Sequence, residues 1–439
     1  MVKSYSFLPE FFRLAGINIL SNLMVPLAGL IDIAFLGHLA DIRHLAGVTL
    51  ATVLFNYIYW TFGFLRMGTT GLIAQAVGRN DDAEILIIGL RNSILAIGLG
   101  VVILLLQHPL REIGFFFLSA TPAVKASAEL FFDALIWGAP ATLFNFVVLG
   151  WFLGAGKGRE VLFLSVIGNG VNIGLDYLLI VRFGWESTGA GTATAASQYL
   201  MAIVGVILIG RSLSKLPIER RDLKLLFQEV LNLKALKAVF LLNSDILIRT
   251  LALISTFAVF TNISSTFGIN ILASNSLLLQ IVTLAAYFID GLAFATESFA
   301  GLFYGKGEVG LLSPLVWASG WVSLICGLAI AVVVSVLPIP LFSLLTRHLE
   351  VVQIAEEYVL WLLPLIGFAS IAYMLDGYFL GLTEGAILRK STIIAALIGF
   401  IPLAFLAWQS QNNHLLWLAL TAFMAARSIT LCLQLFAKK

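Results

Sequence analysis

LAGINILSNLMVPLAGLIDIAFLG, residues 14–37, is an apolar run long enough to cross a bilayer, which takes roughly 20 residues in a helix. The run contains a proline, Pro26, whose missing backbone donor predicts a kinked helix. It also contains one carboxylate, Asp32, which costs about 2.5 kcal/mol or more at the centre of a membrane helix. At 100° per residue, Asn18, Asn22 and Asp32 share one face. We therefore expect this helix to be the movable wall of a wet cavity.

The composition identifies the protein class. The chain has 439 residues, of which 60% are hydrophobic and 11% are charged, and its mean hydropathy is +1.00. Soluble domains carry about 25% charged residues, so this composition indicates an integral membrane protein. The net charge of +2 is spread between apolar runs, which predicts no nucleic-acid partner. The two cysteines lie in apolar segments without metal spacing, and we expect no cofactor and no disulfide framework.

Twelve apolar segments follow one another along the chain. Several are longer than a single span needs and should tilt, bend or protrude. All should be helices, because lipid offers no partner to an open strand edge. Their approximate ranges are 11–37, 45–76, 84–107, 127–153, 160–182, 189–210, 236–262, 268–303, 312–338, 352–381, 390–408 and 414–436.

The distribution of Lys and Arg predicts the orientation. When the N-terminus and every second loop are assigned to one side, that side receives 19 of the 26 basic residues and the other side receives five. Arg66 and Arg249 fall within helices and account for the remainder. The richer side should be cytoplasmic, with both termini there. A bacterial-type plasma membrane fits best, and an organelle envelope stays an alternative.

The chain also repeats itself. The motif GWFLG at 150–154 recurs as GYFLG at 377–381, and VGR at 77–79 recurs as YGK at 304–306, both at an offset of 227. Each half then holds six helices, and an even number inserts both halves the same way up. We expect two pseudo-symmetric lobes, 1–212 and 236–439, joined by a basic cytoplasmic linker at 213–235.

Polar residues gather in the fifth and sixth apolar segments. Asn169, Asn172 and Asp176 are spaced i, i+3, i+7 and should form one stripe. Asp32, Asn172, Asp176 and Thr194 together offer two carboxylates, an amide and a hydroxyl, a set that suits Na⁺ or a bound proton. Asn169 should line the cavity beside them. No other metal site is expected. The alternative is that both aspartates only cap or bridge helices, although acids within a membrane usually serve function.

The second half holds a different polar cluster. Asp245 and Arg249 are i, i+4 and could neutralise each other, as a static pair or a working one. Asp290 and Glu297 are i, i+7 on one face of the eighth segment. They could handle substrate or protons, or serve helix packing.

Taken together, these stretches resemble the MATE (multidrug and toxic compound extrusion) transporters, of the DinF-like branch. The matching stretches span nearly the whole chain: PLAGLIDIAFLGHL (26–39), FLRMGTTGLIAQAVG (64–78), VLGWFLGAG (148–156), GNGVNIGLDYLLIV (168–181), LNSDILIRTL (242–251) and DGLAFATESFAGLFYG (290–305). The resemblance implies an all-α membrane fold with twelve transmembrane helices in two six-helix lobes. It also implies export of drugs or metabolites driven by a gradient of H⁺ or Na⁺.

The resemblance assigns roles by position. Asp32 matches the family's first-helix aspartate, Asn172 and Asp176 match its fifth-helix cation pair, and Thr194 matches its sixth-helix hydroxyl. Family members often carry a proline about fifteen residues before the first-helix aspartate, where this chain has Ile17. The second-lobe cation site of the other main branch is not clearly reproduced, so coupling should lie in the first lobe.

The function expected is therefore cation-coupled antiport of an organic cation or amphipathic metabolite by a monomer in the bilayer. A lipid-linked precursor flippase is the alternative, but it would need a cationic cavity, and the acids here outnumber Arg66 and Arg249. A membrane-embedded enzyme would need a motif such as HExxH or a Ser/Lys dyad, and the sequence has none. A channel is disfavoured because no loop is typical of a selectivity filter.

Overall fold

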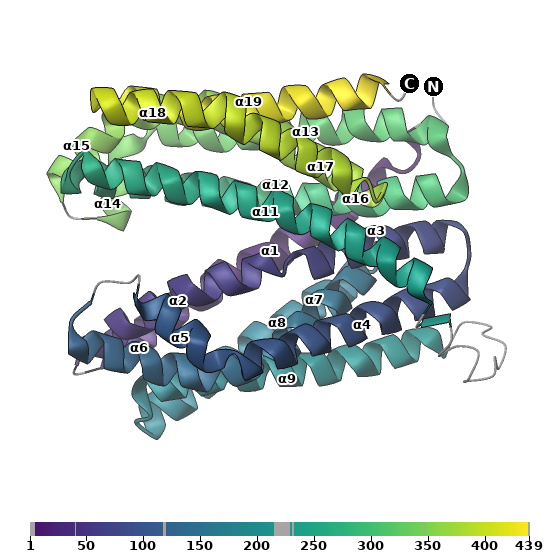
Figure 1. The fold of residues 1–439 in the computed structure, drawn as a ribbon, viewed down its shortest axis with the longest axis horizontal. Coiled ribbons are helices and arrows are strands. Elements are labelled where there is room, and N and C mark those ends of the chain that lie inside the picture. The colour runs from purple at the N-terminus through teal and green to yellow at the C-terminus, as the bar shows by residue number, and fades with distance from the viewer. Residues whose placement is uncertain are drawn as a thin grey trace. The chain divides into compact units, whose positions relative to one another are not determined.

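The computed structural model describes residues 5–39, 41–116, 120–214, 229–230, 232–346 and 348–437. Within these ranges every regular element is a helix (Figure 1). Twelve helical stretches are long and apolar enough to span a membrane, from Leu8–Gly37 to Asn413–Ala437. The twelve predicted segments and the all-α fold are confirmed. Most of the predicted linker, residues 215–228 and 231, lies outside the described residues.

Two compact units make up the chain. The N-terminal unit is Leu20–Phe240, and the C-terminal unit combines the chain up to Ile19 with Leu241–Lys439. The helix α1, Leu8–Gly37, therefore contributes to both units. It is one unbroken helix across Pro26.

Among the described residues, the N-terminal unit contains the rest of α1, the helices α2 to α9 and the beginning of α11, up to Phe240. The second span is interrupted at Phe62–Gly63, between α2 and α3, and the fifth ends in a π-helical turn, Tyr177–Arg182. The helix bounds are α2 Arg43–Thr61, α3 Phe64–Gly78, α4 Asp82–Leu105, α5 Gln107–Phe116, α6 Pro122–Leu135, α7 Ala139–Gly154, α8 Gly158–Asp176 and α9 Glu186–Leu213.

The C-terminal unit follows the same plan with an unbroken second helix. Helix α11, Leu233–Thr266, belongs to this unit from Leu241 onward. The bounds of the other α-helices are α12 Ile269–Lys306, α13 Leu312–Val336, α14 Pro338–Leu345, α15 Leu349–Tyr358, α16 Leu362–Gly381, α17 Gly385–Ile394, α18 Ile401–Ser410 and α19 Asn413–Ala437. A π-helical turn, Ala395–Phe400, joins α17 to α18. A buried apolar core that includes Phe260, Trp417 and Phe423 joins α11 to α19.

A pair of glycines lies at a close helix crossing in the N-terminal unit. Gly150 and Gly154 of α7 lie against the backbone of α3, so that a Cβ atom at Gly150 would stand 2.6 Å from the carbonyl oxygen of Arg66. A Cβ atom at Gly154 would collide with the carbonyl oxygen of Thr70. Small residues four apart let two backbones approach in this way.

The C-terminal unit repeats this crossing in the same register. Gly377 and Gly381 of α16 lie against the carbonyl oxygens of Ala293 and Glu297 of α12. The offset that relates the two glycine motifs also relates Ala293 to Arg66 and Glu297 to Thr70. The motif that marks the repeat in the sequence is therefore a helix–helix contact used twice.

Turns outside the glycine crossings repeat as well. Three pairs of residues with left-handed backbone are related by the same offset, and each pair contains at least one glycine. They are Asn80 (φ 54°) with Gly307 (75°), Gly156 (67°) with Thr383 (58°), and Gly184 (67°) with Gln411 (52°).

Candidate functional site

Two carboxyl groups face each other in the N-terminal unit. Asp176, the last residue of α8, is 1% exposed, and Asp32 of α1 is partly buried. The two side chains are close enough for a protonated carboxyl of one to hydrogen-bond to the other. When both are ionised, neither Asp176 oxygen has a donor among the described residues. The pair is therefore suited to hold a proton or a small cation between its oxygens.

Asn172 lies one turn before Asp176 in α8 and contacts Thr194 of α9. The Thr194 hydroxyl donates to the carbonyl oxygen of Ala190 at 3.0 Å. Its oxygen accepts from Asn172 Nδ2 at 3.3 Å. The Ala190 carbonyl oxygen can only accept, so the Thr194 hydroxyl uses its one proton in that hydrogen bond. The Thr194 oxygen can then only accept from Asn172, so the side-chain nitrogen of Asn172, and not its oxygen, must face Thr194. The Asn172 carbonyl oxygen is thus directed away from Thr194 and is available to a cation.

The predicted coupling set therefore forms two contacting pairs, Asp32 with Asp176 and Asn172 with Thr194. Their shared feature is an excess of acceptor oxygens in a membrane-spanning part of the chain. Oxygen-rich sites of this kind bind hard cations and protons. No group of three or more His, Cys, Asp or Glu suited to a transition metal occurs in the ranges that the structure describes.

The other predicted cavity residues are placed differently. Asn169 donates to the carbonyl oxygen of Ser165 in its own helix, at 2.8 Å. Asn18 is 1% exposed, and neither its oxygen nor its nitrogen has a hydrogen-bond partner among the described residues. It belongs to the C-terminal unit, whereas Asn22 and Pro26 belong to the N-terminal one.

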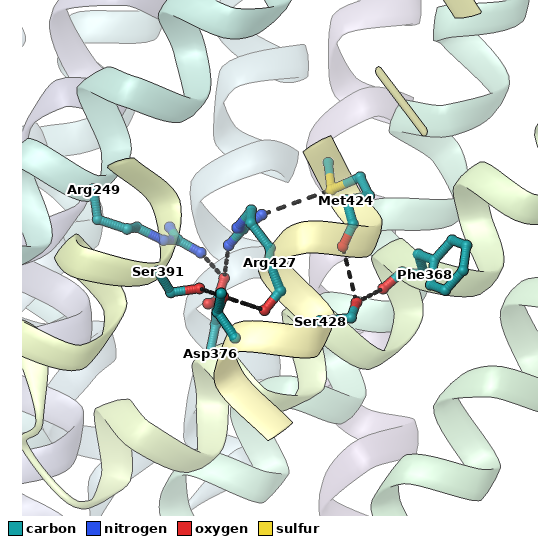
Figure 2. A network of polar contacts seen from close by, with 8 residues as sticks. Arg249, Phe368, Asp376, Ser391, Met424, Arg427 and Ser428 are labelled. Carbon is teal, nitrogen blue, oxygen red and sulfur yellow. Dashed lines mark hydrogen bonds and ion pairs between the residues drawn. The ribbon is translucent and has the colours of Figure 1, made fainter. Parts of the chain in front are cut away.

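A buried ionic network occupies the C-terminal unit. Figure 2 shows the guanidinium groups of Arg249 and Arg427 converging on the carboxylate of Asp376. Arg427 Nη2 lies 2.5 Å from Asp376 Oδ2, and Arg249 Nη2 contacts the same oxygen. The three side chains are at most 7% exposed. The Arg427 guanidinium also lies over the rings of Tyr373 and Phe423.

This network corrects the pairing inferred from helix spacing. Arg249 of α11 pairs with Asp376 of α16, and not with Asp245. Asp245 instead pairs with Arg389, at 2.5 Å. Spacing of i, i+4 permits contact along one helix, but partners on neighbouring helices can satisfy both charges better.

Asp290 and Glu297 remain in α12, but in different surroundings. Asp290 interacts electrostatically with Arg249 and Tyr373, so it belongs with the ionic network. The Glu297 side chain is fully buried. Asp376, Arg427 and Arg389 are the charged partners that the sequence did not assign to the cluster. Asp376 and Arg427 are charged residues inside apolar segments of the sequence, and this pattern could have identified them as members of the cluster.

Comparisons with known proteins agree with this architecture. The family model MatE matches twice, once in each half of the chain, over residues 18–178 and 246–406. The chain is 34% identical to the DNA damage-inducible protein F of Escherichia coli over 422 residues, 96% of this chain and 90% of that protein. It is 27% identical to the chloroplastic protein DETOXIFICATION 44 of Arabidopsis thaliana, covering 92% of this chain and 77% of that one.

A solved structure shares the fold. It is described as the outward-facing conformation of a multidrug resistance MATE family transporter of the MOP superfamily. The superposition has a TM-score of 0.85 and covers 98% of this chain and 95% of that chain, at 21% sequence identity.

Proposed function

The chain belongs to the MatE family of membrane transporters, and we propose that it is a cation-coupled antiporter. It exports drugs or amphipathic metabolites by alternating access between two lobes. The coupling ion, H⁺ or Na⁺, binds among Asp32, Asp176, Asn172 and Thr194. The protein spans a plasma membrane as a monomer, with both termini in the cytoplasm.

The observation that carries the proposal is the apposed pair of carboxyl groups, Asp32 and Asp176. Two carboxylates in one partly buried place repel each other, and a bound proton or cation removes that repulsion. Binding therefore favours an arrangement in which α1 closes on α8, and release favours separation. A ligand that binds one arrangement better shifts the population toward it.

The mechanism follows from this dependence on charge. In the outward-open state a monovalent cation enters the carboxylate pair and lowers its charge from −2 to −1. The pocket can then close around one negative charge shared by the two carboxyl groups instead of two that repel each other, and substrate leaves. Release of the cation to the cytoplasm restores the charge, and a new substrate binds from that side.

The ionic network of the C-terminal unit supports an antiporter over a flippase for lipid-linked precursors. A flippase needs basic groups that are free to bind a diphosphate. Arg249 and Arg427 are buried and committed to Asp376. These two arginines of the C-terminal unit are therefore not offered to a diphosphate group.

The test is efflux of a fluorescent cationic dye from cells and inverted vesicles, with the pH and Na⁺ gradients varied separately. We expect export to follow one of the two gradients and to be lost in Asp32→Asn and in Asp176→Asn. The matched control is Asp81→Asn, because Asp81 caps α4 by accepting from the backbone of Glu84 and asparagine caps equally well.

Two outcomes contradict the proposal. If Asp32→Asn transports like the wild type, coupling does not reside at this pair, and Asp290 and Glu297 are the next acids to test. If neither gradient moves any dye in the wild type, cation-coupled export of dyes is wrong.

A further inference from the structure

A second pair of amides lies on α7 and α9 of the N-terminal unit. Asn145 of α7 is 2% exposed. Its Nδ2 donates to the backbone carbonyl oxygen of Gln198 at 2.9 Å and to the side-chain Oε1 of Gln198 at 2.9 Å. One amide nitrogen thus holds both the backbone and the side chain of Gln198.

These contacts fix the orientation of both amides. A backbone carbonyl oxygen can only accept, so the Asn145 atom that faces it must be the nitrogen. The atom of Gln198 that faces the same nitrogen must then be its oxygen. The Gln198 nitrogen, with two N–H groups, is directed away from Asn145. Neither N–H group has an acceptor among the described residues, since no hydrogen bond from Nε2 occurs there.

The position of Gln198 makes this donor significant. It lies near the middle of the span Glu186–Leu213, where lipid offers no acceptor to an N–H group. At 100° per residue, Gln198 and Thr194 lie on the side of α9 opposite its exposed apolar residues. Those exposed residues are Tyr199, Leu200, Ile203, Val206 and Ile207. The free donor therefore faces into the unit, one helical turn from Thr194.

We propose that Gln198 is a substrate-specificity residue whose side-chain nitrogen donates to an oxygen acceptor of the transported compound. Asn145 is the positioning residue that holds the amide in this orientation. The compounds favoured are amphipathic molecules with a carbonyl, ester or carboxylate oxygen. Asn172 and the carboxylates present acceptors to the cation, whereas Gln198 presents a donor. The inference rests on the proposed export function.

The test compares two monovalent lipophilic cations in the efflux assay. Rhodamine 123 carries an ester carbonyl, and tetraphenylphosphonium has no hydrogen-bond acceptor. In Gln198→Leu we expect the KM for rhodamine 123 to rise about 3- to 10-fold, the effect of one lost hydrogen bond. The KM for tetraphenylphosphonium and the ion dependence should not change. The control is Thr192→Val, because the Thr192 hydroxyl donates only to the carbonyl oxygen of Thr188 in α9.

A double-mutant cycle separates positioning from general structural damage. Asn145→Leu frees the Gln198 amide to rotate, so it should raise the same KM by a smaller factor. In the double variant Asn145→Leu/Gln198→Leu, the first change should add nothing to the second. A purely structural role for Asn145 would instead raise the KM of both compounds, with or without Gln198.

The inference is overturned if the wild type exports both dyes and Gln198→Leu leaves the KM for rhodamine 123 unchanged. If the wild type exports neither dye, binding of rhodamine 123 to the purified protein, measured by fluorescence polarisation, decides the matter. Binding weakened by Gln198→Leu upholds the donor and refutes only the export proposal. Binding that does not depend on Gln198 refutes the donor.

Discussion

Gln411 ends α18 with a left-handed backbone, at φ 52° and ψ 39°. Its counterpart in the first half of the chain is Gly184, at φ 67°. A residue with a Cβ atom costs about 1 kcal/mol or more in this region, and glycine is the usual solution at the end of a helix. The two halves thus use different residues for one backbone geometry.

We expect Gln411→Gly to stabilise the protein by about 0.5–1 kcal/mol, because it relieves this strain. The readout is the midpoint of thermal unfolding in detergent, followed by intrinsic fluorescence. The reciprocal change Gly184→Gln should lower the midpoint. Equal midpoints for all three proteins would mean that the turn stores no strain.

Asp376 holds two buried guanidinium groups, so its loss leaves both unpaired. We expect Asp376→Ala to destabilise the protein by about 3–5 kcal/mol. Asp245→Ala breaks a pair whose arginine is 35% exposed, and should cost less than about 1 kcal/mol. The destabilisation of each variant is measured by the amount of folded protein in detergent and by the midpoint of its unfolding. Similar losses in the two variants would contradict the difference in burial.

The sequence identified most of the charged residues at this scale but could not pair them. Asp32, Asn172, Asp176 and Thr194 were assigned together from spacing and family resemblance, and the structure places them as two contacting pairs. The pairing of Arg249 failed because its partner, Asp376, comes from another helix that is distant along the chain. Helix periodicity predicts contacts within a helix, whereas contacts between helices depend on packing.

At the scale of the helix, Gly377 determines how closely α16 approaches α12. A Cβ atom there would collide with the backbone carbonyl of Ala293, and a backbone atom cannot rotate away. We expect Gly377→Ala to cost about 1–3 kcal/mol through this overpacking. The control is Gly170→Ala in α8, where a Cβ atom meets nothing within 4 Å. That change should be neutral or stabilising, since alanine favours helices by about 1 kcal/mol over glycine.

Thermal unfolding of the two glycine variants gives the answer. An unfolding midpoint of Gly377→Ala at or above that of Gly170→Ala would show that the crossing tolerates a methyl group. The close approach of α16 to α12 would then not depend on glycine.

The spans themselves could be predicted because hydropathy alone defines them. Every predicted segment coincides with an observed span to within a few residues. The short helices α5 and α14 and the interruption at Phe62–Gly63 were not predicted. Apolar composition continues through α14 and through the interruption, so hydropathy does not change where the backbone does. Helix α5, QHPLREIGFF, is instead a short amphipathic helix that is too polar to be read as a span.

At the scale of the whole molecule, the prediction concerns orientation. The excess of basic residues on one side predicts that both termini lie in the cytoplasm. A fluorescent protein fused after Lys439 should therefore fluoresce, because it folds in the cytoplasm. Alkaline phosphatase inserted at Gly184, between α8 and α9, should be active, because that turn faces the other side. Activity of the phosphatase after Lys439 would reverse the topology.

The repeated crossing and the repeated turns give the two halves one backbone plan that carries two different sets of charges. By the offset of 227, the equivalents of Asp32 and Asp176 in the second half are Val259 and Leu403. The equivalent of Arg249 in the first half is Asn22. The two halves therefore share backbone geometry and differ in charge. The N-terminal half carries the acidic pair of Asp32 and Asp176, whereas the C-terminal half holds the carboxylate of Asp376 between two arginines.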